Sequence, residues 1–420
     1  MKQNTIFSIS LILALCTQTI RLNGQTFRTE ALHPSIKTLR IQIIDNWLAP
    51  PVIELNGDDA VEISFDELEE RPSYYVYKLI HCNADWTAST LIEPEYMTGF
   101  QYLPIEDYTL SFNTTVDYIH YKLLFPNENT TFKTSGNYAV LVFPEKDQTV
   151  PVLTACFSVV ETEVSINTQI SSNTDIDFNR VHQQVSFDVV LNGNYSPTPQ
   201  DYKVYVQQNH RRDNQAELLQ PLMTEPRKLT FAHNPKLIFE AGNEYRRFEH
   251  ITNRYKGIGI ENVGFHSPYY HVDIYPELIR SKKGYSYDQD INGRFLIRST
   301  DASDYDWEAD YAVFHFYFPV EQPFLENIYM LSGIHYNVLD TRSLMKYNNE
   351  LKAYELNIML KQGHYNYMFV TKKSGSSAGN TALIEGNYFE TENEYTVYVY
   401  HRPFGGRYDR LVGVNTTLFR

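Results

Sequence analysis

Short runs of alternating apolar and polar residues recur along the whole chain. The run at 36–43, Ile-Lys-Thr-Leu-Arg-Ile-Gln-Ile, alternates over part of its length, and the run at 74–80 places alternate side chains on one face. A period of two is typical of half-buried β-strands, and long helical periods are missing. Other strand-like runs, several of them closed by proline, have the pattern of short strands joined by turns. They lie at 116–125, 138–143, 202–207, 311–318, 365–370 and 395–400.

This series of short strands predicts an all-β fold made of tandem antiparallel β-sandwich domains, immunoglobulin-like or E-set in type. Two breaks in the series indicate domain junctions: a polar stretch at 167–179 and an acidic run at 299–310. The resulting pieces have the usual size of a sandwich domain. We therefore expect a first sandwich at 26–162, a second at 163–303 and a third, E-set-like, at 304–420.

The N-terminus has the architecture of a secretory signal peptide. A short positive region at 1–5 precedes an apolar run at 6–15, and a polar stretch of mostly small residues follows to Gln25. The apolar run is too short to span a bilayer. We expect residues 1–25 to be a signal peptide cleaved near Gln25, which exports the mature chain. Lipidation at Cys16 is the alternative, although Leu15 is bulky where a lipoprotein signal usually has glycine or alanine.

Charge narrows the classes of partner. The chain carries 36 Lys and Arg against 51 Asp and Glu, a formal net charge of −15. Binding to nucleic acid needs clustered basic residues, and an anionic membrane surface attracts a polybasic patch. The sequence therefore predicts neither a nucleic-acid partner nor direct membrane insertion.

Tyrosine and cysteine usage each leave two interpretations open. The 33 Tyr and 24 Phe favour strands, but tyrosine-rich clusters also form binding surfaces. The mature chain keeps Cys82 and Cys156, which an oxidising compartment would allow to pair. They are equally compatible with two buried free thiols.

The densest polar and aromatic cluster is His-Cys-Asn-Ala-Asp-Trp at 81–86, at the end of a predicted strand. Asn83 and Asp85 provide turn chemistry, and Trp86 is expected to cover the edge of a core with its indole N–H bonded to the turn. His81 and Cys82 would suit catalysis, but no matching base or metal partner is near them in the sequence. We therefore interpret the cluster as structural.

Two other segments resemble functional motifs only in part. Residues 375–379 fit G-x-S-x-G around Ser377, but a nucleophile elbow needs a preceding strand, a following helix, and then Asp and His in that order. Here the flanks read as a hairpin loop. Asp288, Asp290 and Asn292 resemble the start of an EF-hand loop, yet Ser299 occupies the twelfth position, where a bidentate Glu is required. A polar turn is the preferred interpretation, with weak calcium binding as the alternative.

Two further groups lack the context that their chemistry requires. Gly257, Gly259 and Gly264 have no strand–turn–helix frame for a dinucleotide. His266 and His271 have neither an HExxH pattern nor a cysteine pair beside them, so a metal site is not expected. The sequence thus assigns no catalytic, cofactor-binding or metal-binding residue, and it predicts a protein that is not an enzyme and has no cofactor.

A set of segments in a fixed order resembles the plug protein family of the type IX secretion system, periplasmic β-rich proteins also catalogued as a domain of unknown function. The segments lie at 81–86, 99–100, 107–114, 118–121, 125–127, 135–138, 207–211, 242–246, 290–293, 308–311, 360–367, 385–388, 391–393 and 407–411. Each is weak alone, but their order and spacing cover most of the mature chain.

The resemblance implies a periplasmic protein that caps the mouth of a large outer-membrane β-barrel translocon and keeps the idle pore closed. Its expected partner is that barrel protein, which would hold it at the outer membrane. The third segment also resembles the E-set sandwich of glycogen-binding modules at 327–333 and 360–367, although no Trp follows Gly333. An exported carbohydrate-binding protein is therefore the alternative function.

Overall fold

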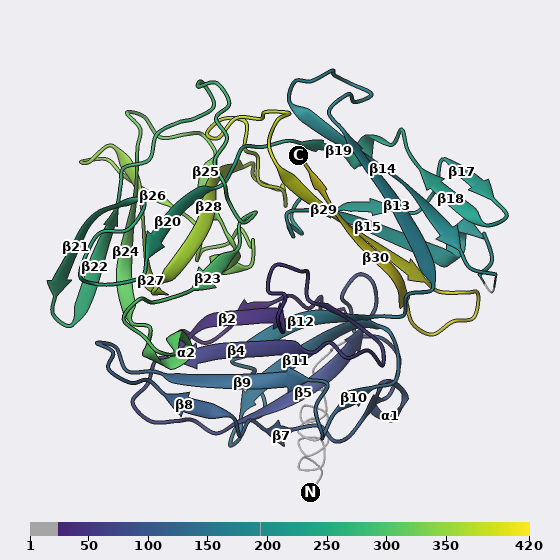
Figure 1. Ribbon diagram of the computed structural model, residues 1–420, viewed down its shortest axis with the longest axis horizontal. Coiled ribbons are helices and arrows are strands. Elements are labelled where there is room, and N and C mark those ends of the chain that lie inside the picture. The colour runs from purple at the N-terminus through teal and green to yellow at the C-terminus, as the bar shows by residue number, and fades with distance from the viewer. Residues whose placement is uncertain (1–23, 194) are drawn as a thin grey trace, which may run out of the picture.

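The computed structural model describes residues 24–193 and 195–420 (Figure 1). It is 47 % strand and 4 % helix, which confirms the predicted all-β fold class. Residues 1–23, which include Cys16 and most of the expected signal peptide, lie outside the described residues. The described chain forms three sandwiches, placed like the corners of a triangle in Figure 1.

The first sandwich pairs two sheets around a large apolar core. One sheet has the order β1-β12-β11-β5-β7, with β3 parallel to β12, and the other has the order β2-β4-β9-β8. The bounds of the first sheet are β1 (Glu30–Ala31), β3 (Val52–Glu54), β5 (Tyr75–Cys82), β7 (Leu103–Pro104), β11 (Gly136–Pro144) and β12 (Leu153–Val160). The second contains β2 (Ile36–Ile43), β4 (Val61–Glu67), β8 (Tyr108–Leu110) and β9 (Ile119–Phe125). A small ribbon joins β6 (Met97–Thr98) and β10 (Thr131–Phe132) beside the one-turn helix α1 (Glu93–Tyr96).

The second sandwich is built from two distant parts of the chain. Its first sheet, β13-β14-β18-β17 with β19 on β14, contains β13 (Val164–Ser171), β14 (His182–Leu191), β17 (Met223–Glu225), β18 (Lys228–Phe231) and β19 (Ile238–Glu240). Its second sheet, β16-β15-β29-β30, contains β15 (Tyr202–Gln208), β16 (Ala216–Leu218), β29 (Asn393–His401) and β30 (Arg410–Phe419). Figure 1 shows the yellow C-terminal strands beside teal β15.

The third sandwich lies between β19 and β29 in the sequence, so it is an insertion into the second. One sheet, β20-β28-β23 with β25 on β28, contains β20 (Arg246–His250), β23 (Phe295–Ile297), β25 (Asn327–Leu331) and β28 (Gly363–Lys372). The other, β21-β22-β24-β27-β26, contains β21 (Ile260–His266), β22 (Tyr269–Ile274), β24 (Tyr311–Pro319), β26 (Lys346–Asn348) and β27 (Ala353–Lys361). The one-turn helix α2 (Tyr305–Glu308) precedes β24.

This pairing corrects the expected division at 163–303 and 304–420. Strands β20 to β23 fall in the expected second domain but lie in the third sandwich, and β29 and β30 fall in the expected third domain but pair with β15. The physical reason is that alternation locates strands without specifying their partners. The strands of the first sandwich all lie within 26–162.

Sixteen of the 33 tyrosines are buried in the structure. Tyr118, Tyr138 and Tyr365 are fully buried and donate their hydroxyl hydrogens to backbone carbonyls, for example Tyr118 to Ala309 at 2.8 Å. A buried tyrosine fills a core while its hydroxyl keeps a partner. The largest fully buried side chains include eight tyrosines: Tyr118, Tyr121, Tyr138, Tyr245, Tyr311, Tyr365, Tyr367 and Tyr395.

Cys82 and Cys156 are both buried free thiols. Cys82 lies on β5 and Cys156 on β12, and β11 runs between these two strands. Neighbouring strands are about 4.8 Å apart, so two strands that flank a third are separated by about twice that distance. A disulfide requires Cα atoms within about 7 Å. The pairing is therefore excluded by the sheet order.

Candidate functional site at the junction of three sandwiches

The polar cluster at 81–86 forms a tight turn after β5. The backbone N–H of Trp86 donates to the carbonyl of Asn83 at 2.9 Å, and Asp85 accepts from the N–H of Thr87 at 3.1 Å. These are the turn roles that the sequence predicts for Asn83 and Asp85.

His81 is buried within this cluster. Its Nε2 donates to the carbonyl of Ser135 at 3.1 Å, and its Nδ1 lies 2.9 Å from the hydroxyl of Ser89. Burial lowers the pKa of His81 to about 4, although the Ser135 carbonyl opposes that shift. A neutral imidazole with both nitrogens bonded to such groups is a structural histidine, which agrees with the interpretation of the 81–86 cluster as structural.

The same turn also joins two sandwiches, which the sequence did not indicate. The N–H of Ala84 donates to Asp409 Oδ2 at 3.0 Å, and Arg402 donates to the side-chain oxygen of Asn83 at 2.6 Å. Arg402 and Asp409 belong to the loop between β29 and β30. The first and second sandwiches are therefore fastened to each other at this turn.

Trp86 is half-buried and packs against the apolar side chains on the outer face of β5, β11 and β12. It adopts a φ of 63°, and the guanidinium of Arg212 from the second sandwich lies 4.0 Å from the centre of its ring. Within the described part of the chain, no hydrogen bond is found for its indole N–H. Trp86 thus covers a core edge as expected, but a cation stacks on it instead of the expected turn bond.

A buried ion pair joins the first and third sandwiches. Lys361 Nζ lies 2.7 Å from Asp66 Oδ2, and both side chains are 1 % exposed. His120 Nδ1 and the Tyr311 hydroxyl each approach the same carboxylate at 2.6 Å. Burial by itself would raise the pKa of Asp66, but Lys361 and His120 outweigh it and hold the pKa at about 2.

A second ion pair extends this junction. Arg40 on β2 donates to Asp306 on α2 at 2.6 Å, and the two side chains are 10 % and 16 % exposed. Lys122 on β9 lies 3.7 Å from the other oxygen of Asp306. The junction therefore holds ionised groups away from water, which is favourable only when each has a partner.

The second and third sandwiches meet through Arg294 and the loop after β15. Arg294 donates to Glu394 at 2.9 Å, and the same carboxylate lies 2.6 Å from His210. Arg211 pairs with Asp213 at 2.7 Å, and Asp213 also accepts from the N–H of Gly379. The Arg294–Glu394 pair thus joins the second and third sandwiches, as Asp66–Lys361 joins the first and third.

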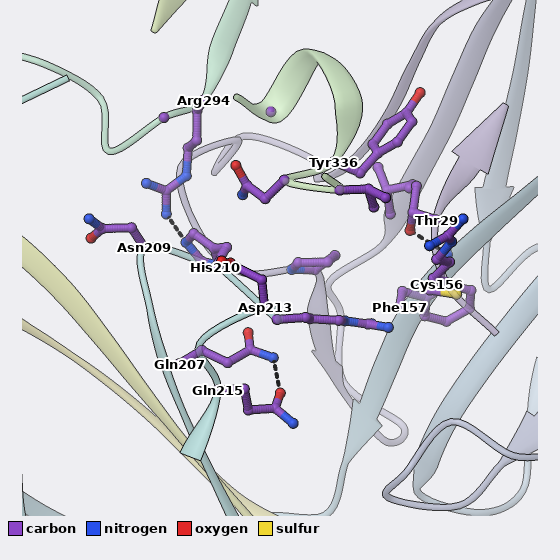
Figure 2. Close-up of a pocket in the computed structure, with 18 of the residues that line it drawn as sticks. Thr29, Cys156, Phe157, Gln207, Asn209, His210, Asp213, Gln215, Arg294 and Tyr336 are labelled. Carbon is purple, nitrogen blue, oxygen red and sulfur yellow. Dashed lines mark hydrogen bonds between the residues drawn. The ribbon is translucent and has the colours of Figure 1, made fainter. Parts of the chain in front are cut away.

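A cavity of about 500 Å³ opens where the three sandwiches meet. Figure 2 shows Phe157 of the first sandwich, Gln207 of the second and Tyr336 of the third at its wall. Gln207 donates to Gln215 at 2.6 Å, and Arg294 contacts His210 across one end. The volume is within the range of small-molecule sites.

The motif-like segments lie apart from one another. Residues 375–379 form a loop after β28 with no helix following, and only Ser377 of this loop lines the cavity. Asp290 uses both carboxylate oxygens to accept backbone N–H groups of Tyr245 and Asn292, while Asp288 pairs with Arg247 at 2.8 Å. Neither segment gathers the groups that its motif would need.

The histidine pair that the sequence singled out lies at the edge of the third sandwich. The rings of His266 and His271 are 5.3 Å apart, and His271 Nδ1 lies 2.8 Å from Nε2 of His315, a residue that the local sequence pattern does not indicate. Strand order brings His315 there because β22 pairs with β24. Over residues 24–193 and 195–420, no group of three or more His, Cys, Asp or Glu is arranged to hold a metal ion.

Gly257 and Gly259 lie where another backbone segment comes too close to leave room for a Cβ atom. Gly259, at φ +75°, and Gly257 lie in the loop between β20 and β21, and a Cβ on Gly257 would meet the Glu249 carbonyl at 1.8 Å. The loop interpretation of these glycines agrees with this geometry. None of the helices in the described chain is long and apolar enough to cross a membrane.

Comparison with known families identifies the first sandwich. Residues 36–161 match the family model described as Type 9 secretion system plug protein 1st domain. The first sandwich belongs to the family of type 9 secretion system plug protein first domains. The matched residues run from β2 through β12 and include the turn at 81–86.

One solved structure is similar to almost the whole chain. A crystal structure of a hypothetical protein from Parabacteroides merdae is 45 % identical, with a TM-score of 0.93, over 94 % of this chain and 100 % of that one. A chaperone–tip adhesin complex of CFA/I fimbriae aligns at 13 % identity over 48 % of this chain and 87 % of that one. Its TM-score of 0.14 is too low to indicate a shared fold. No curated protein matches the chain.

Proposed function

We propose that this protein is a non-enzymatic plug that closes the periplasmic opening of the large outer-membrane β-barrel translocon of the type IX secretion system. The observation that carries the proposal is the match of residues 36–161 to the first domain of the plug family. The protein would act in the periplasm, held at the outer membrane by its barrel partner.

Rigidity of the three-sandwich body supports this function. A stopper must keep its shape against a wide opening, and it needs no chemistry of its own. The buried pair Asp66–Lys361 ties the first sandwich to the third, and Asp409 ties the first to the second. The second and third are also joined by two chain connections, because one is inserted into the other. Such a body resists hinge motion between its parts.

The contact with the barrel is proposed to include the loop between β29 and β30. Phe404 at its tip is 104 % exposed, and Ile92 and Phe100 in the neighbouring part of the first sandwich are 65 % and 79 % exposed. Arg407 pairs with Glu95 at 2.6 Å, which holds the loop against α1. Exposed aromatic residues on a rigid base are typical anchors of protein interfaces.

Outer-membrane permeability tests the function. Deleting the protein should leave the barrel assembled and its pore open. A pore wide enough for folded proteins passes molecules that porins exclude. We expect the deletion strain to become sensitive to a bulky antibiotic, and deletion of the barrel as well should reverse that sensitivity. Unchanged permeability, with the barrel shown to be present and otherwise empty, would refute the plug.

A pull-down distinguishes the plug from the alternative of an exported carbohydrate-binding protein. The tagged protein is recovered from solubilised outer membrane and its partners are identified by mass spectrometry. A very large barrel protein is the expected partner. Retention on polysaccharide columns without any barrel protein would favour the alternative.

A further inference from the structure

The cavity at the three-sandwich junction has the charge opposite to that of the chain. The protein carries a formal net charge of −15, yet the cavity lining contains five cationic side chains and one carboxylate, Asp213. Asp213 is itself neutralised by Arg211. The cationic residues are Arg28, Arg40, Arg212, Arg294 and Lys372. Arg28, Arg40 and Arg294 pair with carboxylates outside the lining, so the local excess of positive charge that favours an anionic occupant comes from the other two cations.

Two of these cations have no carboxylate partner among the described residues. Arg212 makes one hydrogen bond, to the carbonyl of Phe27 at 3.4 Å, and Lys372 donates to the carbonyl of Leu339 at 3.1 Å. Stacking on Trp86 occupies the face of the Arg212 guanidinium and leaves N–H groups at its edge. A guanidinium edge binds a carboxylate through two parallel hydrogen bonds.

Flat rings and amides complete the lining. Trp47 and Trp86, two of the three tryptophans, are half-buried at the cavity. Asn292 and Asn337 also line it, and the side-chain oxygen of each is buried without a hydrogen-bond partner. Amide oxygens of this kind accept hydrogen bonds from hydroxyl groups. The lining thus offers ring faces, hydroxyl acceptors and a carboxylate receptor together.

We propose that this cavity is a binding site for a small acidic saccharide, such as one containing a uronic acid. The carboxylate would bind Arg212 beside Trp86, the flatter face of the sugar ring would pack on Trp47, and hydroxyl groups would donate to the asparagine oxygens. A purely apolar ligand would leave Arg212 and these amides without partners. Inorganic phosphate would bind the cationic side chains but would make no contact with the aromatic rings.

Calorimetry with the mature protein tests the proposal, using a disaccharide of galacturonic acid as the probe and the corresponding neutral galactose disaccharide as its match. The acidic disaccharide should bind, and the neutral one should bind at least about tenfold more weakly, because it lacks the charge-assisted bonds. Equal affinity for the two, or no saturable heat from the acidic one at millimolar concentration, would overturn the proposal.

Variants locate the site. Arg212→Gln should weaken binding of the acidic disaccharide about tenfold or more, whereas Arg254→Gln, a surface arginine with a 79 % exposed side chain, should not change it. If Arg212→Gln does not fold, Lys372→Gln serves as the second test. Unchanged affinity in a folded Arg212→Gln or Lys372→Gln protein contradicts the assignment.

Fluorescence and competition give an independent measurement. Ligand binding should change tryptophan emission in the wild type, and the change should shrink in Trp86→Phe. Adenosine monophosphate, inorganic phosphate and a short acidic peptide compete for the same charges. Tighter binding of any of them than of the acidic saccharide would reject the saccharide. The measurements use the isolated protein, so their failure leaves the plug function untouched.

Discussion

Asp409 accepts a hydrogen bond from the backbone N–H of Ala84, a residue 325 positions earlier in the chain. The Asp409 side chain is 1 % exposed, and it also pairs with Lys203 at 3.1 Å and Arg402 at 2.7 Å. One carboxylate therefore satisfies groups from the first and the second sandwich at once. Its position explains why the chain places a tight polar turn directly after β5.

Asp409→Ala should destabilise the protein by about 3 kcal/mol, because it leaves two cations and a buried N–H without their partner. Unfolding in urea, followed by tyrosine and tryptophan fluorescence, measures the change. Asp147→Ala is the matched control, since Asp147 is exposed and bonds only to nearby Thr149. An Asp409→Ala protein as stable as this control would show that the turn does not hold the sandwiches together.

Lys361→Met tests the buried pair between the first and third sandwiches. Removing Lys361 leaves the buried Asp66 carboxylate without its ammonium partner, and breaking a buried pair in this way typically costs about 3–5 kcal/mol. The double variant Asp66→Asn with Lys361→Met should be less destabilised than the sum of the single variants, because the two residues contact each other. Lys352→Met, whose partner Glu321 is exposed, should change stability little.

Acid unfolding provides a second measurement of the same pair. The pKa of Asp66 is lowered from 3.8 to about 2 in the folded protein, so the folded state binds its proton more weakly than the unfolded state. Its stabilisation is present above pH 3.8 and is lost as the pH falls toward 2. In Lys361→Met the pKa of Asp66 should rise and the loss should begin at higher pH. An unchanged acid limb in the variant would show that Lys361 does not control Asp66.

The sequence predicted local features better than distant contacts. Alternation located most of the strands, and the turn chemistry of Asn83 and Asp85 agrees with the structure. The pairing of β29 with β15 was not predictable, because strand partners depend on the whole tertiary arrangement. The contacts between the sandwiches could not be predicted for the same reason. Arg40 and Asp306 are 266 residues apart, and the local sequence pattern around either residue does not indicate that it contacts the other.

A weak signal for the junctions was nevertheless present. Asp66 and Lys361 each occupy the end of an apolar strand, β4 and β27, where a charged side chain must either reach water or find a partner. Both are buried, so both needed a partner. The cavity had no comparable signal, because its lining comes from all three sandwiches and depends on how they meet.

Stability should also decrease as the pH rises above about 5. Burial raises the pKa of Glu244 to about 7 and that of Asp290 to about 6, so the folded state holds these protons more tightly than the unfolded state. Stability from this source is present at pH 4.5 and is lost as the pH rises through 7. This is the opposite of the effect of Asp66, and it acts in a separate pH range.

Glu244→Gln isolates that effect. Glutamine keeps the oxygen that accepts from Tyr285 at 2.5 Å but removes the charge. We expect the free energy of unfolding of the variant to exceed that of the wild type by about 1–2 kcal/mol at pH 8. Its melting temperature should change less than that of the wild type between pH 5 and 8. Glu390→Gln, at an exposed position, is the control. Parallel pH curves for the wild type and Glu244→Gln would contradict the role of Glu244.

Phe404 at the tip of the β29–β30 loop should matter for partner binding and not for folding. Its side chain is 104 % exposed, so Phe404→Asp removes no core contact and should leave the melting temperature unchanged. An aromatic anchor at an interface contributes about 2 kcal/mol or more, which corresponds to about a thirtyfold loss of affinity for the barrel.

The matched control is Leu325→Asp, because Leu325 is 107 % exposed in the third sandwich, away from the proposed contact. The two variants introduce the same charge at equally exposed positions, so a general effect of added charge would appear in both. Pull-down of the barrel should fall with Phe404→Asp alone, and only that variant should raise antibiotic sensitivity when it replaces the wild-type protein in cells. Equal recovery of the barrel by the two variants would place the contact elsewhere on the molecule, whereas loss of recovery in both would show that charge, and not the aromatic ring at 404, determines the interaction.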